Sequence, residues 1–142
     1  MKQVKRLRDR KGSAFIEVLF LNIIITFLFI MALMVFMRAV TVYRIDEACT
    51  QIGHDIVSCN NLDEAQALAQ TTAYALLKDS SMIDETSISC EVAYAAGGTA
   101  EWKKGNFLTV YMSAKIKNDF FSLNRTHNKT VTVMIERKEK TT

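Results

Sequence analysis

The sequence has no proline among its 142 residues and only five glycines. After Gly12 the next glycine is Gly53, so the stretch between them holds neither of the two strongest helix breakers. This absence predicts one continuous helix from about Ser13 to about Ser58. Gly53 weakens its far end, and the pair Asn60 and Asn61 ends it.

Histidine is scarce as well, which limits the catalytic and metal sites that the chain can build. His54 lies next to Asp55 on the predicted helix, His127 lies in a polar loop (residues 124–128), and neither has a partner at a metal-motif spacing. No glycine-rich phosphate loop or serine elbow occurs. We therefore predict no catalytic residues, no cofactor and no metal site, and a protein that is not an enzyme.

The three cysteines, Cys49, Cys59 and Cys90, are an odd number. Cys49 and Cys59 would lie about 15 Å apart along a continuous helix, which is too far for a disulfide. A disulfide between Cys59 and Cys90 is compatible with the sequence. Three reduced cysteines that act as small apolar residues are equally compatible with it.

Acidic residues are rare in the first eleven positions, where one acid stands among six basic residues. This segment has a net charge of +5, so the whole-chain charge of +3 leaves −2 for the remainder. Because the positive charge is confined to the leader, the folded part offers little to nucleic acid, which we exclude as a partner. A basic segment before an apolar stretch instead indicates that the amino terminus stays on the cytoplasmic side of the membrane.

The residues from Val18 to Met37 form a block of 20 in which only Asn22 and Thr26 are polar. As a helix this block would be about 30 Å long, which matches the hydrocarbon thickness of a bilayer. No small-x-small cleavage site follows it, so we expect the span to be retained. The predicted organisation is a basic leader (residues 1–12), the transmembrane part of the helix (13–40) and an extracytoplasmic domain (41–142).

Beyond the block, apolar residues continue at helical spacing through Ile45, Ala48, Cys49, Ile52 and Ile56. A capping pattern, Asn61 followed by Glu64, opens a second helix that should end near residues 78–81 and whose shared face is Leu62, Ala65, Ala69, Ala73 and Leu76. Alternating patterns then predict three strands, at residues 88–94, 107–116 and 130–137. The predicted class is α+β, in which a long amino-terminal transmembrane helix continues into a small domain with a second helix and a three-stranded antiparallel sheet.

Gly12 directly follows the basic run, and Glu17 is the fifth residue after it, at the start of the apolar helix. This arrangement resembles the prepilin signature of the type IV pilin superfamily. More narrowly, Gly12, Ser13, Ala14 and Glu17 resemble the opening of TadE-like pseudopilins from tight-adherence (Tad) pilus systems. The closing segment, residues 131–136, is similar to the strand that ends many such proteins.

The resemblance implies that a prepilin peptidase cuts between Gly12 and Ser13 and leaves a new α-amino group on Ser13. It also implies that Glu17 pairs with the positive amino terminus of a neighbouring subunit as the helix moves from the bilayer into a filament. The implied partners are the peptidase, other pilin or pseudopilin subunits, a membrane assembly platform and the lipid bilayer.

Two positions depart from the family pattern. Ser13 stands where major pilins have Phe, which puts amino-terminal methylation in doubt, and Ile23 stands where TadE-like proteins often have Pro, so we expect a helix without a kink. Asn22 is a candidate for a hydrogen bond between helices, with a bond inside its own helix as the alternative.

The predicted function is that of a minor pilin-like subunit of a Tad-like pilus or related secretion system. It would be a single-pass protein of the cytoplasmic membrane, with its amino terminus inside and its carboxyl-terminal domain outside. The alternative is an unprocessed membrane-anchored protein whose extracytoplasmic domain binds a partner and for which Glu17 is incidental.

Overall fold

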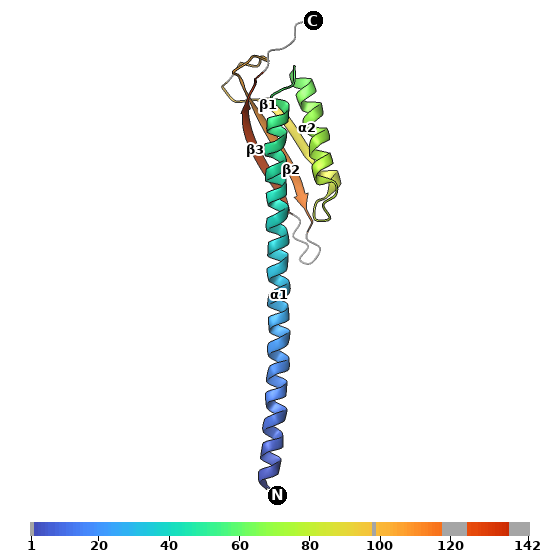
Figure 1. Cartoon of the computed structure of the whole chain (residues 1–142), viewed down its shortest axis with the longest axis vertical. Coiled ribbons are helices and arrows are strands. Elements are labelled where there is room, and N and C mark those ends of the chain that lie inside the picture. The colour runs from blue at the N-terminus through green and yellow to red at the C-terminus, as the bar shows by residue number, and fades with distance from the viewer. Residues whose placement is uncertain (1, 98, 118–124, 137–142) are drawn as a thin grey trace. The chain divides into compact units, whose positions relative to one another are not determined.

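The computed structural model describes residues 2–97, 99–117 and 125–136, with side chains from residue 14 onward. Its elements are α1 (Lys2–Ile56), α2 (Leu62–Leu77), a short 3₁₀ turn η1 (Glu85–Ser87), β1 (Ser89–Tyr94), β2 (Phe107–Ile116) and β3 (Arg125–Met134) (Figure 1). The predicted α+β class, with a long apolar helix, a second helix and a three-stranded antiparallel sheet, is confirmed. The chain divides into two compact units, Met1–Met37 and Arg38–Thr142.

Helix α1 begins at Lys2, eleven residues before the predicted start at Ser13, so that boundary was wrong. The leader is made largely of lysine, arginine and glutamine, which are good helix formers, and a single glycine costs only about 1 kcal/mol in a helix. Gly12 therefore does not break the helix. The other end, at Ile56, lies within two residues of the predicted one.

Helix α2 begins at the predicted cap. The Asn61 side-chain oxygen accepts a hydrogen bond from the Glu64 backbone N–H at 2.7 Å. Glu64 in turn accepts one from the backbone N–H of Asn60 at 2.9 Å. Two of the N–H groups at this helix start are thereby satisfied by side chains. The helix ends at Leu77, with Lys78 as its cap, as predicted.

The sheet has the strand order β1-β2-β3, and both pairings are antiparallel. The third strand runs from Arg125 to Met134, so the predicted start at Thr130 was wrong, and His127 lies in a strand rather than in a loop. The early part of β3 escaped prediction because its inward positions are polar. His127 and Lys129 stand opposite Ala114 and Met112 in the register, where an apolar residue would be expected.

One hydrophobic core lies between the sheet and the carboxyl-terminal part of α1 together with α2. The predicted stripe of α1 is confirmed, because Ile45, Ala48, Cys49, Ile52 and Ile56 are all buried. In α2 the buried residues are Ala65, Ala69, Ala73 and Leu77. Leu76, which was predicted to share that face, is 42% exposed. Strict spacing of four along α2 brings Leu77 into the core in its place.

Gly53 explains how closely α1 approaches the sheet. A Cβ atom at this position would lie 3.0 Å from the Cγ1 of Val133 and 3.4 Å from the Cγ1 of Val131. A side chain at this position would therefore require the Val133 side chain to shift, and a large side chain would crowd β3. The sequence presented Gly53 as a weakness of the helix, but in the fold it is the residue that permits this packing.

Candidate assembly site

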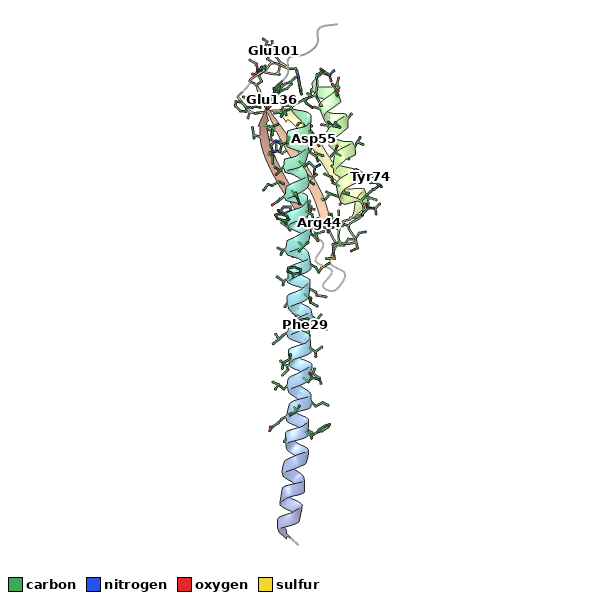
Figure 2. All side chains as sticks on the ribbon, in the orientation of Figure 1. Phe29, Arg44, Asp55, Tyr74, Glu101 and Glu136 are labelled. Carbon is green, nitrogen blue, oxygen red and sulfur yellow. The ribbon has the colours of Figure 1, made fainter. Side chains whose placement is uncertain are left out.

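The amino-terminal unit is a helix with apolar side chains on every side. From Ala14 to Ile30 every side chain is exposed, and Phe29, labelled in Figure 2, is 63% exposed. This is the one helix in the described part of the chain that is long and apolar enough to cross a membrane. Water is a poor environment for such a surface, because burial of apolar area stabilises by about 25 cal/mol per Å². This apolar surface would be removed from water by a lipid bilayer or by packing against the helices of other subunits.

Glu17 is the only ionisable residue from Ala14 to Met37. Its side chain is exposed, and among the described residues no hydrogen bond or ion pair involves it. The helix backbone cannot help a carboxylate in mid-helix, because its N–H groups are already bonded within the helix. A carboxylate at this position therefore needs water, a lipid headgroup or a cation from another molecule.

The two other polar residues of the apolar block behave differently from each other. The Thr26 hydroxyl donates to the Asn22 carbonyl oxygen at 2.8 Å, so it is satisfied within α1. The Asn22 side chain is exposed, and no bond to it occurs within the described residues. At 100° per residue, Glu17 and Asn22 lie about 140° apart around the helix. They would therefore meet different neighbours.

Gly12 and Ser13 lie inside α1, so the peptide bond between them is helical here. The side chains of these two residues are outside the described part. The structure thus places the predicted processing site, Gly12 and Ser13, one turn before Glu17 on the same helix. It does not test the cleavage, which stays a prediction.

Two glutamines of α2 form a contact that the sequence analysis missed. Gln66 donates to the Cys90 carbonyl oxygen at 2.8 Å and accepts from the Val92 N–H at 2.7 Å. Gln70 donates to the Ile88 carbonyl oxygen at 3.3 Å and accepts from the Cys90 N–H at 2.9 Å. Each side-chain amide therefore bonds to β1 as a peptide group of a neighbouring strand would. The sequence did contain one indication of this contact: Gln66 and Gln70 are four residues apart, which places both amides on one side of α2.

His127, which the sequence placed in a polar loop, lies in β3 and contacts α1. Its Nε2 lies 3.0 Å from Asp46 Oδ1, and Lys129 Nζ lies 3.4 Å from Asp46 Oδ2. Burial alone would raise the pKa of the Asp46 carboxyl. Hydrogen bonds from His127 and Lys129 outweigh that effect and hold the pKa below its ordinary value. The three side chains tie the start of β3 to α1.

The cysteines of the carboxyl-terminal unit are buried free thiols. Desolvation by burial raises the pKa of Cys90 to about 12, with Cys49 as a further cause, and burial also raises the pKa of Cys59. Thiols of this kind stay protonated at neutral pH and are poor nucleophiles. The disulfide between Cys59 and Cys90 stays a prediction.

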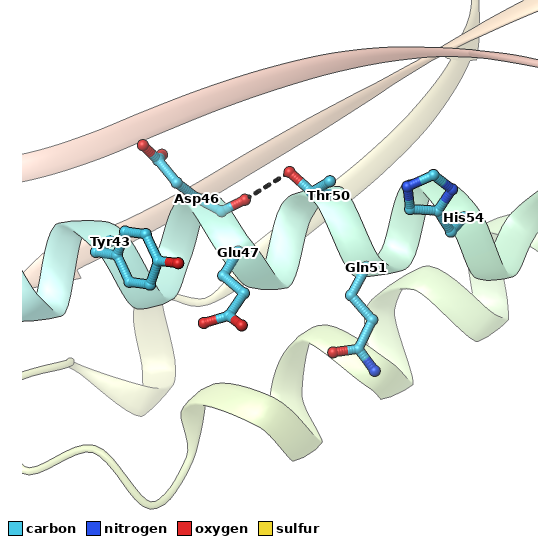
Figure 3. Close-up of a pocket in the computed structure, with 6 residues that line it drawn as sticks. All are labelled: Tyr43, Asp46, Glu47, Thr50, Gln51 and His54. Carbon is cyan, nitrogen blue, oxygen red and sulfur yellow. Dashed lines mark hydrogen bonds between the residues drawn. The ribbon is translucent and has the colours of Figure 1, made fainter.

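One hollow on the surface of this unit is lined by a single helix. Figure 3 shows its lining residues, Tyr43, Asp46, Glu47, Thr50, Gln51 and His54, and all six come from α1. Thr50 donates back to the Asp46 carbonyl oxygen at 2.9 Å, within the helix. In the ranges that the structure describes, no three metal-ligating side chains gather in one place. The hollow is therefore a shallow part of the α1 surface, and among the described residues no second element contributes a side chain to its lining.

Comparison of the chain with protein-family models, with curated proteins and with solved structures finds no match.

Proposed function

We propose that the protein is a pilin-like minor subunit of a Tad-like type IV pilus or related secretion system. In this proposal it is cleaved after Gly12 by a prepilin peptidase and assembles through its amino-terminal helix. The observation that carries the proposal is Glu17. It is the one ionisable residue between Ala14 and Met37, a stretch of α1 that is otherwise apolar, it has no partner among the described residues, and it is the fifth residue after Gly12.

The energetics favour a partner for this carboxylate. An ionised side chain in the middle of a bilayer costs about 2.5 kcal/mol or more, and the cost falls toward the headgroups. Near the cytoplasmic headgroups Glu17 can therefore stay solvated while the subunit waits in the membrane. Once the helix is withdrawn among other helices, a cation from a neighbouring subunit would offset the loss of water.

Cleavage would supply that cation. Removing residues 1–12 leaves an α-amino group on Ser13, which is positively charged over most of the physiological range. The peptide bond to be cut is helical, so the peptidase must unwind the helix locally. Gly12 lowers the cost of that unwinding, because glycine is about 1 kcal/mol less favourable in a helix than alanine. Gly12 also leaves space for the peptidase near the backbone.

The carboxyl-terminal unit fits an accessory role better than that of a short major pilin. It carries its own core, which packs the end of α1 and helix α2 against a three-stranded sheet. In this proposal it stays outside the cytoplasmic membrane and contacts other subunits. The partners are the peptidase, other pilin or pseudopilin subunits, the assembly platform and the bilayer.

Substitution of Glu17 by Gln tests the proposal in the native host. Glu17→Gln keeps the shape of the side chain but removes its charge, and Glu47→Gln makes the same change at an exposed acid on α1 in the other unit. A charge-assisted bond contributes about 1.5 to 3 kcal/mol, so we expect at least about a tenfold loss of filament-associated protein for Glu17→Gln. Glu47→Gln should assemble normally. Full assembly of Glu17→Gln would favour the unprocessed, membrane-anchored binding protein instead.

A further inference from the structure

The two edges of the sheet are treated differently. In an antiparallel sheet, alternate residues of an edge strand direct both backbone groups away from the sheet. On β1 these residues include Cys90 and Val92, and Ile88 just before the strand continues the alternation, because Ala95 bonds toward β2 through Phe107. Gln66 and Gln70 occupy four of their outward groups. This edge is closed to another strand.

The edge of β3 has no such closure. Ile135 exchanges hydrogen bonds with residues 105 and 106 on the β2 side, so the odd residues of β3 bond toward β2 and the even residues bond outward. The outward residues are Thr126, Asn128, Thr130, Thr132 and Met134. In the described part of the chain no hydrogen bond reaches their outward N–H and carbonyl groups. All five side chains are exposed, and the strand contains neither proline nor a bulge.

An open edge ten residues long is a pairing site unless something protects it. Two arrangements with a second copy of this chain are disfavoured. Pairing of β3 with β1 of another copy is blocked by Gln66 and Gln70. Helix α1 runs alongside β3 in the same direction, since Asp46 lies beside His127 and Gly53 lies beside Val133. Antiparallel pairing of two β3 strands would therefore make the two α1 segments run in opposite directions, with their Arg38 residues at opposite ends of the joined sheet. Two copies anchored in one membrane cannot adopt that arrangement, and this step rests on the proposed membrane anchoring.

Charge indicates the chemistry of the occupant. Arg125, His127 and Lys129 share the face of β3 that lies toward α1. Asp46 contacts His127 and Lys129, and within the described ranges no acid pairs with Arg125. The second half of the same face carries Val131 and Val133, which pack against the core. A neighbouring strand would place its side chains about 5 Å from these residues. Carboxylates suit the first half, and β-branched apolar side chains suit the second.

We propose that the open edge of β3 binds an extended segment of a different polypeptide, which adds a fourth strand to the sheet. The bound segment carries carboxylates beside Arg125, His127 and Lys129 and apolar side chains beside Val131 and Val133. Backbone hydrogen bonds to the even residues provide the attachment, and the alternating side chains provide the selectivity. Gln66 and Gln70 direct the partner to β3 by closing the other edge.

The test uses the full chain in lipid nanodiscs and two synthetic ten-residue peptides with blocked ends. In each peptide Thr alternates with a second residue. That second residue is Glu in the first half and Val in the second half of one peptide, and Val first and Glu second in the other. One order fits a parallel strand and the other an antiparallel strand. Amide hydrogen exchange measured by NMR gives the readout, residue by residue. The amides of Thr126, Asn128, Thr130 and Thr132 should exchange rapidly in the free chain and become protected with one peptide.

Two controls separate strand pairing from unspecific contact. Thr130→Pro removes the central outward N–H without removing a β2–β3 hydrogen bond and should abolish the protection, whereas Thr130→Ala keeps the N–H and should bind like the wild type. Replacing Glu by Lys in the peptide should weaken binding at least about fivefold, because like charges on neighbouring strands repel. The thermal unfolding midpoint of each variant shows whether its fold is intact.

Several outcomes would overturn the proposal. The even amides could stay unprotected at millimolar concentrations of both peptides. They could instead be protected in the chain alone. Protection that rises with the concentration of the chain would assign the edge to a second copy, and protection independent of concentration would assign it to another segment of the same chain. Cleavage after Gly12 affects none of these readouts, so a failure here leaves the proposed processing untouched.

Discussion

Replacing the two glutamines of α2 gives the sharpest prediction about the fold. Gln66→Ala removes two short hydrogen bonds to β1, of 2.8 and 2.7 Å, and Gln70→Ala removes two longer ones, of 3.3 and 2.9 Å. A net hydrogen bond contributes about 0.5 to 1.5 kcal/mol, so each substitution should cost about 1 to 3 kcal/mol. Alanine returns a few tenths of a kcal/mol through its higher helix propensity. Gln66→Ala should therefore be the more harmful of the two.

A second pair of variants distinguishes hydrogen bonding from packing. Gln66→Glu and Gln70→Glu keep the shape of the side chain, but a carboxylate cannot donate to the Cys90 or Ile88 carbonyl oxygen. Each should lose at least as much stability at pH 7 as the alanine variant does. Lowering the pH should restore part of the loss, because a protonated carboxyl can donate.

Urea unfolding of the full chain in detergent, followed by the fluorescence of Trp102, measures these free energies. Amide hydrogen exchange at Cys90 and Val92 gives the local readout, since their N–H groups bond to the glutamines. Wild-type stability in Gln66→Glu, or unchanged exchange at Val92 in Gln66→Ala, would refute the argument that these amides replace a neighbouring strand.

Three further predictions concern the packing of the same unit. Asp46→Asn should destabilise by about 0.5 kcal/mol at pH 7. Because folding lowers the pKa of Asp46, its contribution is present above the unfolded pKa of about 4 and is lost as the pH falls through the lowered pKa. The free energies of unfolding of the two proteins should therefore converge once the pH is below that lowered pKa. The Cys90 thiol, buried and with its pKa raised to about 12, should resist iodoacetamide at pH 8 until urea unfolds the chain; rapid labelling by mass spectrometry would contradict this. Gly53→Leu should cost about 1 to 3 kcal/mol, and Val133→Ala should recover part of it in a double-mutant cycle, whereas additive losses would refute the steric cause.

The sequence predicted those parts of the fold in which burial repeats with a regular period. The stripe from Ile45 to Ile56 and the small-residue face of α2 were read correctly, because a helix that packs on a core must place apolar residues at every third or fourth position. The Asn61 cap was predicted from a local pattern of four residues. The strands β1 and β2 followed from strict alternation.

Contacts between distant segments could not be predicted in this way. The start of β3 looked like a loop because His127 and Lys129 take inward positions that Asp46, 81 residues from His127, makes tolerable. The bonds from Gln66 to β1 likewise join elements 24 and 26 residues apart. Periodicity reports which face of an element is buried but not which polar groups meet across it.

The candidate site falls between these two cases. The sequence identified Gly12, Ser13 and Glu17 by their order along the chain, and the structure places all three on one helix. Their proposed roles involve a peptidase and a neighbouring subunit, so no contact within this chain can supply them. Glu17 stands out physically because the described residues offer it no partner.

The most direct test of the account is the amino terminus of the protein extracted from the membranes of its native host. Intact mass with amino-terminal sequencing should find a chain that begins at Ser13, with residues 1–12 removed. The new amino group would then lie one helical turn before Glu17. A chain that still carries residues 1–12 in assembled material would contradict the account, because Glu17 would have no cleaved amino terminus with which to pair.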